Sequence, residues 1–213
     1  MFKRIGFIRL FVILMALAVN CAFALSADEA MEKSKAWFKS GKAWNLEFRV
    51  QVFYSDSPDI ASQGGKLLVA EGDRFVLDMA GIKFYSDGES LWQYNVEQNQ
   101  VLIKSVEDLS SSLHPSELLF KYLNCKAKAI SEGEFNKQKM WVLTLDPSKY
   151  KGQFTQMEVW LSKSDFSPKR LYTVDPAGNG SWYNIVNLSV VKSWKAEDFK
   201  YKPIKGVDEI DMR

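Results

Sequence analysis

Hydrophobic and polar residues alternate with a period of two over most of the chain after residue 41. The clearest run is 44–52, where every second residue is apolar, and this is the pattern of a half-buried β-strand. Similar patterns predict further strands at 65–70, 74–79, 82–86, 91–94, 101–104, 127–131, 140–145, 153–161, 169–174 and 182–188. Consecutive strands with few helices between them indicate an antiparallel sheet. About ten such strands are expected to form a strongly curved sheet or an open barrel.

Two segments follow a helical period instead. In 27–40 the residues Ala30, Met31, Ser34, Trp37 and Phe38 are spaced as one face of a helix, and Gly41 stands at its end. A shorter helix is predicted at 115–123, with Pro115 at its first position. Since it lies between two runs of strands, we expect it to cover the sheet or to close an opening in it. Residues 55–64 are expected to form a loop, and Glu132-Gly133 a turn.

The first 24 residues have the pattern of a secretory signal peptide. Three basic residues precede an apolar run at 10–19, and Ala22-Phe23-Ala24 is a small-x-small cleavage pattern. The apolar run is shorter than the roughly 20 residues of a membrane span. Lipid attachment at Cys21 is disfavoured, because Asn20 and Ala18 fit a lipoprotein acylation motif badly. We therefore expect cleavage after Ala24, a periplasmic protein, and a single domain at 25–213.

Composition and charge remove several classes of function. Loss of residues 1–24 would leave 25 basic and 26 acidic residues, a net charge of −1, which gives no case for nucleic-acid binding. One His and two Cys cannot supply a His-cluster or Cys-only metal site, so no metal or other cofactor is expected. The chain is instead rich in aromatic residues, with 14 Phe, 8 Tyr and 7 Trp. This profile favours a β-rich binding protein over an enzyme.

His114 is the one residue on which a catalytic triad could depend. The nearby serines and Asp108 share a single short loop with it, whereas triad members usually come from different elements. A structural role at the start of the 115–123 helix is the better interpretation. The acidic residues Asp208, Glu209 and Asp211 are expected in a solvated C-terminal tail.

The main candidate for a binding site is the amount of apolar strand face. These side chains could pack as an ordinary core, or they could line a cavity for an apolar ligand beneath a helical lid. Periodicity alone does not separate the two interpretations. The candidate cavity residues are Trp44, Leu46, Phe48, Val50, Val52, Leu68, Phe75, Leu77, Met79 and, in the lid, Leu118 and Leu119.

Several short motifs, taken in order, resemble the outer-membrane lipoprotein carrier (LolA) family. They are Gly65-Lys-Leu-Leu-Val69 with Arg74-Phe75, Ser86-Asp87-Gly88 with Leu91-Trp92 and Tyr94, Pro115 with Leu118-Leu119, Val174-Asp175 with Gly178, and Phe199-Lys-Tyr-Lys-Pro203 with Lys205-Gly206-Val207-Asp208. No single motif is specific, but together they extend from about residue 27 to the end of the chain.

The resemblance implies a highly curved, incomplete antiparallel barrel covered by helices. It also implies a carrier that takes triacylated lipoproteins from an inner-membrane lipoprotein-releasing ABC transporter and delivers them to an outer-membrane receptor. Each exposed methylene costs about 0.8 kcal/mol in water, so acyl chains need such shielding. We expect a monomer.

The chain departs from the family pattern at two places. Glu71 stands where members often have an Arg that helps to hold the lid closed, and Ile204 replaces the second Pro of the C-terminal motif. The resemblance therefore does not imply an identical lid mechanism. A related protein that binds another lipid or glycolipid, an envelope-stress sensor, and a packed β-domain that docks a protein remain as alternatives.

Overall fold

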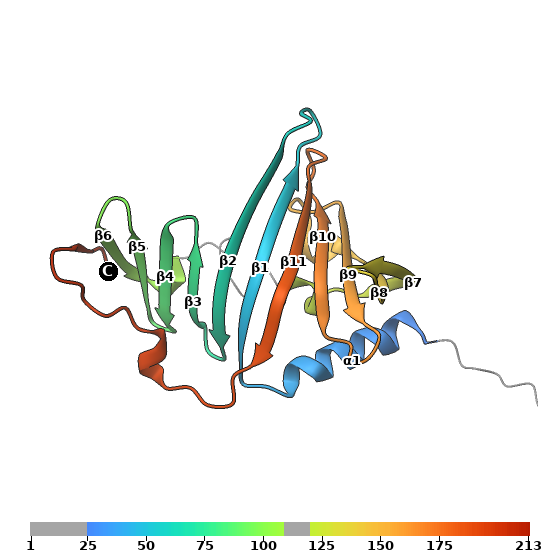
Figure 1. The fold of residues 1–213 in the computed structure, drawn as a ribbon, viewed down its shortest axis with the longest axis horizontal. Helices are drawn as coiled ribbons and strands as arrows, with labels where there is room; N and C mark the ends of the chain where they lie inside the picture. The colour runs from blue at the N-terminus through green and yellow to red at the C-terminus, as the bar shows by residue number, and fades with distance from the viewer. Residues whose placement is uncertain (1–24, 109–119) are drawn as a thin grey trace, which may run out of the picture.

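The computed structural model describes residues 25–108 and 120–213. In these residues one α-helix accompanies a single twelve-stranded sheet (Figure 1). The elements are α1 (Ala27–Lys39), β1 (Ala43–Phe53), β2 (Ile60–Ala70), β3 (Arg74–Met79), β4 (Ile82–Asp87), β5 (Ser90–Asn95), β6 (Gln100–Ser105), β7 (Ala127–Phe135), β8 (Gln138–Leu145), β9 (Gln156–Ser162), β10 (Pro168–Val174), β11 (Gly180–Val190) and β12 (Asp208–Asp211), with short 3-10 turns η1 (Val106–Asp108), η2 (Lys121–Asn124), η3 (Pro147–Tyr150) and η4 (Ala196–Phe199).

Helix α1 begins and ends where the sequence predicts. The Ser26 hydroxyl accepts a hydrogen bond from the Glu29 backbone N–H (3.1 Å), which satisfies a free donor of the first turn. Asp28 and Glu29 place negative charge at the positive end of the helix dipole. The buried face of the helix packs against β7, β8 and η2.

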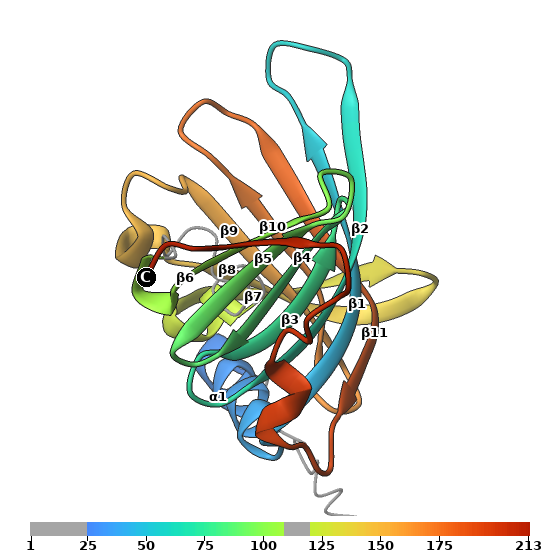
Figure 2. The same ribbon diagram turned by 90° about the vertical axis from the view of Figure 1, so that its left-hand side faces the viewer.

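The strand order is β12-β6-β5-β4-β3-β2-β1-β11-β10-β9-β8-β7. All neighbouring pairs are antiparallel except β12 and β6, which are parallel. The two end strands, β12 and β7, do not pair with each other, and the sheet bends strongly without closing (Figure 2). The predicted curved, unclosed antiparallel sheet is therefore confirmed. The C-terminal acidic segment is exposed as expected, but it adds a strand to the sheet edge instead of forming only a tail.

Two local predictions were wrong. Strand β2 begins at Ile60, not 65, because residues 60–64 pair with the end of β1, and the resulting hairpin extends beyond the neighbouring strands (Figure 1). Gly133 lies inside β7 and not in a turn. The chain turns at Asn136 and Lys137, whose φ angles are 51° and 61°.

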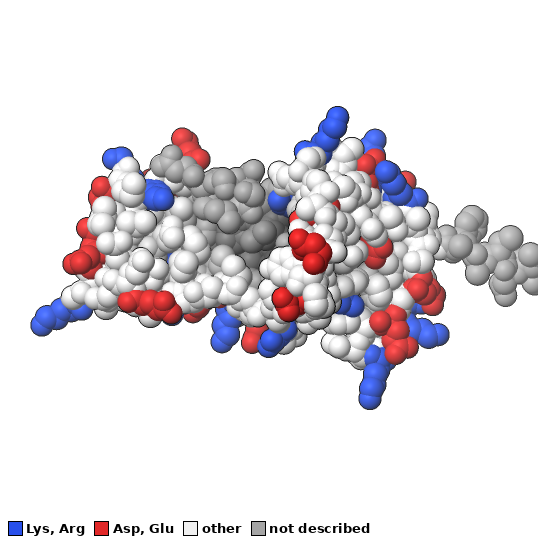
Figure 3. All heavy atoms as spheres, turned by 90° about the horizontal axis from the view of Figure 1, so that it is seen from above, with Lys and Arg blue, Asp and Glu red and all other residues white. Residues whose placement is uncertain are grey.

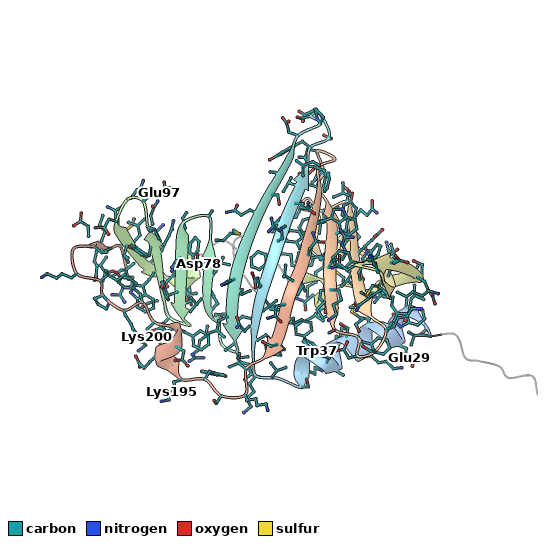
Figure 4. The ribbon with its side chains drawn as sticks, viewed as in Figure 1. Glu29, Trp37, Asp78, Glu97, Lys195 and Lys200 are labelled. Atoms are coloured by element: carbon teal, nitrogen blue, oxygen red, sulfur yellow. The ribbon has the colours of Figure 1, made fainter. Side chains whose placement is uncertain are left out.

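The concave side of the sheet, on which α1 packs, is called the inner face here, and the convex side is called the outer face. Residues 191–207 cross the outer face of the β2–β6 half before the chain joins the sheet edge as β12 (Figure 2). Phe199 is buried there against Ala43 and Ala70, and Tyr201 packs against Val101 and Ile103. Lys195 and Lys200 mark the part of this segment around η4, beneath the lower ends of β3 and β4 (Figure 4).

Some predicted features lie outside the described residues. These are the N-terminal segment 1–24, His114, the lid residues Leu118 and Leu119, and most of the 115–123 helix. Its end is described as η2. Within the described part of the chain, no helix combines the length and the apolar character that crossing a membrane requires.

Candidate functional site

The candidate site is the inner face of β1 to β5. Strand register brings Leu46 opposite Leu67, Leu67 opposite Leu77, and Val69 opposite Phe75, so the inward side chains form a continuous apolar layer. The inward positions of β1, β2 and β3 carry no charged residue. We call the buried members of this layer the inner-face cluster: Leu46, Phe48, Leu67, Val69, Phe75, Leu77 and Leu91.

Burial decreases along the strands toward the tip of the β1–β2 hairpin. Leu46 and Phe48 are only 1% and 4% exposed, whereas Val50 and Val52, further along β1, are partly exposed. On β3, Phe75 and Leu77 are buried and Met79 is partly exposed. The apolar layer therefore continues from a packed end to an end where its side chains reach solvent.

The described surface seen from the tips is mostly uncharged. Lys and Arg lie mainly around the rim of the molecule, while some Asp and Glu residues lie nearer its middle (Figure 3). Burial also raises the pKa of Tyr183, an inner-face residue of β11 that contacts the cluster. An apolar environment of this kind suits a hydrocarbon ligand and does not suit a charged one.

The other half of the inner face is filled by the chain itself. Residues of α1, η2 and β8 to β10 form a second core, in which Leu143, Met157, Val159 and Leu161 are fully buried. Tyr122 of η2 is also fully buried, and its hydroxyl lies 3.0 Å from the Ser34 hydroxyl of α1. This burial raises the Tyr122 pKa.

Three aromatic rings join the two halves. Phe38 of α1 lies 5.6 Å from Trp44 of β1 and 4.8 Å from Phe120, measured between ring centroids. Trp44 and Phe120 contact both cores. Trp44 therefore stands at the boundary between the filled half and the partly open half, and its indole Nε1 is buried without a hydrogen-bond partner among the described residues.

The structure brings most of the predicted site residues together. Seven of them belong to the inner-face cluster or pack against it: Trp44, Leu46, Phe48, Val50, Phe75, Leu77 and Met79. Val52 lies on the same face, nearer the tip and outside the cluster. The contribution of Leu118 and Leu119 falls outside the described residues.

Leu68 was wrongly assigned to this face. It pairs with Asn45 of β1 and Val76 of β3, whereas its neighbours Leu67 and Val69 pair with inward residues. Alternation along the strand therefore turns Leu68 to the outer face, where it packs near Phe199 beneath the C-terminal segment.

Other residues of the layer were not identified from the sequence. Leu67, Val69 and Leu91 are buried in it, and Phe84, Phe120, Tyr183 and Leu188 pack against it. Leu67 to Ala70 is an unbroken apolar run, so the sequence pattern of β2 does not show which of its residues face inward. The pairing register with β1 determines which face each of them is on.

The described residues offer little for covalent or metal chemistry. Cys125 is buried, and burial raises the pKa of its thiol to about 11, which keeps it protonated at neutral pH. No group of three or more His, Cys, Asp or Glu side chains in residues 25–108 and 120–213 is arranged to hold a metal ion.

Glu71, which stands where the family often has an Arg, lies in the exposed turn between β2 and β3. Its backbone carbonyl accepts a hydrogen bond from Arg74 Nη1 (3.0 Å), and the Arg74 guanidinium lies 5.7 Å from the Trp194 ring. This turn is at the packed end of β1 to β3, so Glu71 is distant from the partly exposed end of the apolar layer.

The sequence of this chain is similar to those of known lipoprotein carriers. The sequence model of the family described as "Outer membrane lipoprotein carrier protein LolA" matches residues 40–202. An outer-membrane lipoprotein carrier protein of Legionella pneumophila (strain Corby) is 23% identical over 207 residues, which cover 95% of this chain and 98% of the relative.

A solved structure shows a similar fold. A conserved protein from Thermus thermophilus matches with a TM-score of 0.56 at 14% identity, covering 87% of this chain and 98% of the other. A LolA superfamily protein from Nitrosomonas europaea matches with a TM-score of 0.46 at 11% identity, covering 84% of this chain and 99% of the other. Because the family's sequence model matches well over half of the chain, this protein belongs to the outer-membrane lipoprotein carrier family LolA.

Proposed function

We propose that this protein is a periplasmic carrier that shields the acyl chains of lipoproteins against its inner apolar layer and transfers them from the inner to the outer membrane. The observation that supports this most is the change from a packed to a partly exposed apolar face along β1 and β3. A filled domain would cover that face along its whole length, whereas a carrier needs apolar surface that a chain can enter and leave.

The energetics fit such a role. Covering a methylene group contributes about 0.8 kcal/mol, so a chain of many methylenes gains substantially from even an incomplete apolar layer. The layer has no charged group at its inward positions on β1 to β3, so it would hold hydrocarbon without selecting one precise pose. Release to a receptor then remains possible.

The ligand site is tested by placing a charge on the partly exposed end of the layer. Val50→Glu should reduce the affinity for a dansyl-labelled fatty acid about tenfold or more, because a carboxylate resists transfer into an apolar surrounding. Ser62→Glu is the matched control, since Ser62 is exposed on the outer face of the neighbouring strand. Equal affinity of both variants in a fluorescence displacement assay would contradict the assignment. This pair is preferable to charged substitutions of Phe48 or Leu77, because these side chains are buried and a charge there should also destabilise the fold.

The cargo and the membrane partners need a separate test. Purified protein is incubated with inner-membrane vesicles that contain the lipoprotein-releasing ABC transporter and a triacylated lipoprotein, and the released fraction is examined by native mass spectrometry. A complex of this chain with the lipoprotein, dependent on ATP, is expected. A different bound lipid would make the protein a related lipid or glycolipid carrier, and a protein that stays empty would favour a packed docking domain.

Export is part of the same proposal. Cleavage of the signal peptide after Ala24 would leave Leu25 as the first residue, immediately before the Ser26 cap of α1. N-terminal sequencing of the periplasmic protein should therefore begin at Leu25. A protein that retains residues 1–24 or carries lipid at Cys21 would be membrane-attached and would contradict a diffusing carrier.

A further inference from the structure

The outer face of the β7–β11 half carries an unusual set of aromatic side chains around one arginine. The Arg170 guanidinium lies 3.5 Å from the Trp182 ring centroid, 4.4 Å from that of Phe135 and 5.3 Å from that of Trp160. Tyr172 stacks on Trp182 with centroids 4.3 Å apart. We call these five residues the Arg170 stack. All five are partly exposed, although large aromatic side chains usually avoid the solvent side of a sheet.

Two glycines make room for this arrangement. A Cβ atom on Gly133 would lie 2.7 Å from the Trp160 ring, and one on Gly180 would lie 2.9 Å from the Tyr172 hydroxyl. The ring of Tyr172 therefore lies against the backbone of the neighbouring strand β11, and the ring of Trp160 reaches across β8 to the backbone of β7, so a side chain at either glycine would displace these rings. The stack is a built feature of the surface and not a chance cluster.

The Arg170 guanidinium has no carboxylate partner among the described residues. Its Nε is buried without a hydrogen bond, and its terminal nitrogens make no hydrogen bond to the described part of the chain. Burial lowers the pKa of this group, as expected for a cation held without a counter-ion. Lys163 also lies over an aromatic ring, that of Trp141, but unlike Arg170 it forms an ion pair, with Glu132.

Unsatisfied polar atoms concentrate at the same place. Trp160, Arg170 and Asn184 are cross-strand neighbours, and each has a buried polar atom without a partner among the described residues. Such atoms are rare in folded proteins and need an explanation. Here they support a surface that serves recognition more than stability.

A second arginine, which has no carboxylate partner among the described residues, extends the surface. Arg49 of β1 is opposite Asn184, and Asn184 is opposite Arg170, so the two arginines are two strands apart on one face, about 10 Å at the usual strand spacing. Arg49 also lines a hollow of about 350 Å³ between Gly64 and the exposed Val186, and Lys66, Glu47 and Asp78 line the same hollow. The two arginines favour a partner that supplies carboxylates, and the hollow beside Arg49 offers space for one of its side chains.

We propose that the Arg170 stack and Arg49 form a docking surface for an acidic segment of a partner protein, whose carboxylates pair with the two guanidinium groups. Trp, Tyr and Arg are the residues that dominate protein–protein binding energy. The Arg170 guanidinium lies over the rings of Trp182 and Phe135, and Tyr172 packs on the ring of Trp182.

The chain itself shows how such a face is covered. On the β2–β6 half, the outer face is also aromatic, and residues 191–207 cover it with Trp194, Phe199 and Tyr201. Among the described residues no segment covers the Arg170 stack in the same way. A partner segment would fill on this half the place that the C-terminal segment fills on the other.

The experiment uses a displayed library of seven-residue peptides, selected on the purified protein and counter-selected on its Arg170→Ala variant. Recovered peptides should carry Asp or Glu beside an apolar residue. A synthetic copy of one such peptide should bind the Arg170→Ala variant at least about tenfold more weakly than it binds wild type. Arg170→Lys should restore only part of the affinity, because an ammonium group cannot pair with a carboxylate through two parallel hydrogen bonds as a guanidinium can. Binding should also weaken at high salt.

Two further variants allow the proposal to be tested even if the Arg170→Ala variant does not fold. Arg49→Ala changes an exposed side chain outside the stack and should weaken peptide binding severalfold, whereas Lys128→Ala, at the other end of β7 from Phe135, should not. Peptides without acids, no enriched peptide, or equal affinity for wild type and Arg49→Ala would overturn the proposal. A dimer in sedimentation that Arg49→Ala abolishes would also overturn it, because the partner would then be a second copy of this chain. Displacement of the peptide by oligogalacturonate alone would overturn it in favour of a glycan ligand.

Discussion

The two halves of the inner face are both apolar, yet only one is filled by the chain. On the β7–β10 half, α1 and η2 bury Leu143, Met157 and Val159 completely. On the β1–β5 half, the inner-face cluster is packed at one end, and Val50 and Met79 reach solvent at the other. From this difference we infer that the filled half stabilises the fold and that the partly open half is available to a ligand.

The largest expected difference between the halves is in stability. Leu143→Ala removes a fully buried side chain and should lower the free energy of unfolding by about 2–5 kcal/mol. Met79→Ala, in the partly open half, should cost less than about 1 kcal/mol, since a site near solvent leaves no closed cavity. Urea denaturation of both variants measures the difference. Equal losses would mean that the β1–β5 half is packed as tightly as the other.

Thiol chemistry gives a second contrast. Burial raises the Cys125 pKa from its ordinary value of 9.0 to about 11. At pH 8 its thiolate fraction is therefore about 100-fold lower than that of a free cysteine, and alkylation by iodoacetamide should be slower by at least that factor. Met79→Cys, made in a Cys125→Ala background, should react much faster. Similar rates for the two thiols would contradict the difference in burial.

The smallest expected effect concerns the contact between α1 and η2. Tyr122→Phe removes the hydrogen bond to Ser34 and should cost about 1 kcal/mol at neutral pH. Because the folded-state pKa of Tyr122 is raised above the unfolded value near 10, its contribution is complete below pH 10 and is lost as the pH rises further. Urea denaturation above pH 10 should show a steeper loss for wild type than for the Phe variant. The same dependence of the unfolding free energy on pH in both proteins would contradict the burial of the Tyr122 hydroxyl.

The sequence predicts the inner layer well where one face of a strand is polar. Strand β1 has Asn45, Glu47 and Arg49 between its apolar residues, so its inward face is evident. Strand β2 ends in the unbroken run Leu67 to Ala70, because the inner layer covers one face and the C-terminal segment covers the other. Alternation could not place Leu68, and only the register with β1 does so.

Two other features had no sequence signal of their own. Strand β12 consists of Asp208 to Asp211, which has no strand-like alternation, and it forms because the edge of β6 supplies hydrogen bonds. The Arg170 stack was missed because Trp160 lies between Val159 and Leu161 in an apolar run. Long-range pairing, and not local pattern, determines both.

The most direct test of the central claim is photolabelling with a fatty acid that carries a diazirine in its chain, followed by peptide mapping with mass spectrometry. The account predicts labels on the partly open half, at Val50, Met79 and Phe84 and their neighbours. Labels confined to the filled core around Met31 and Met157, labels on the outer face, or no labelling above that of a denatured control would contradict it.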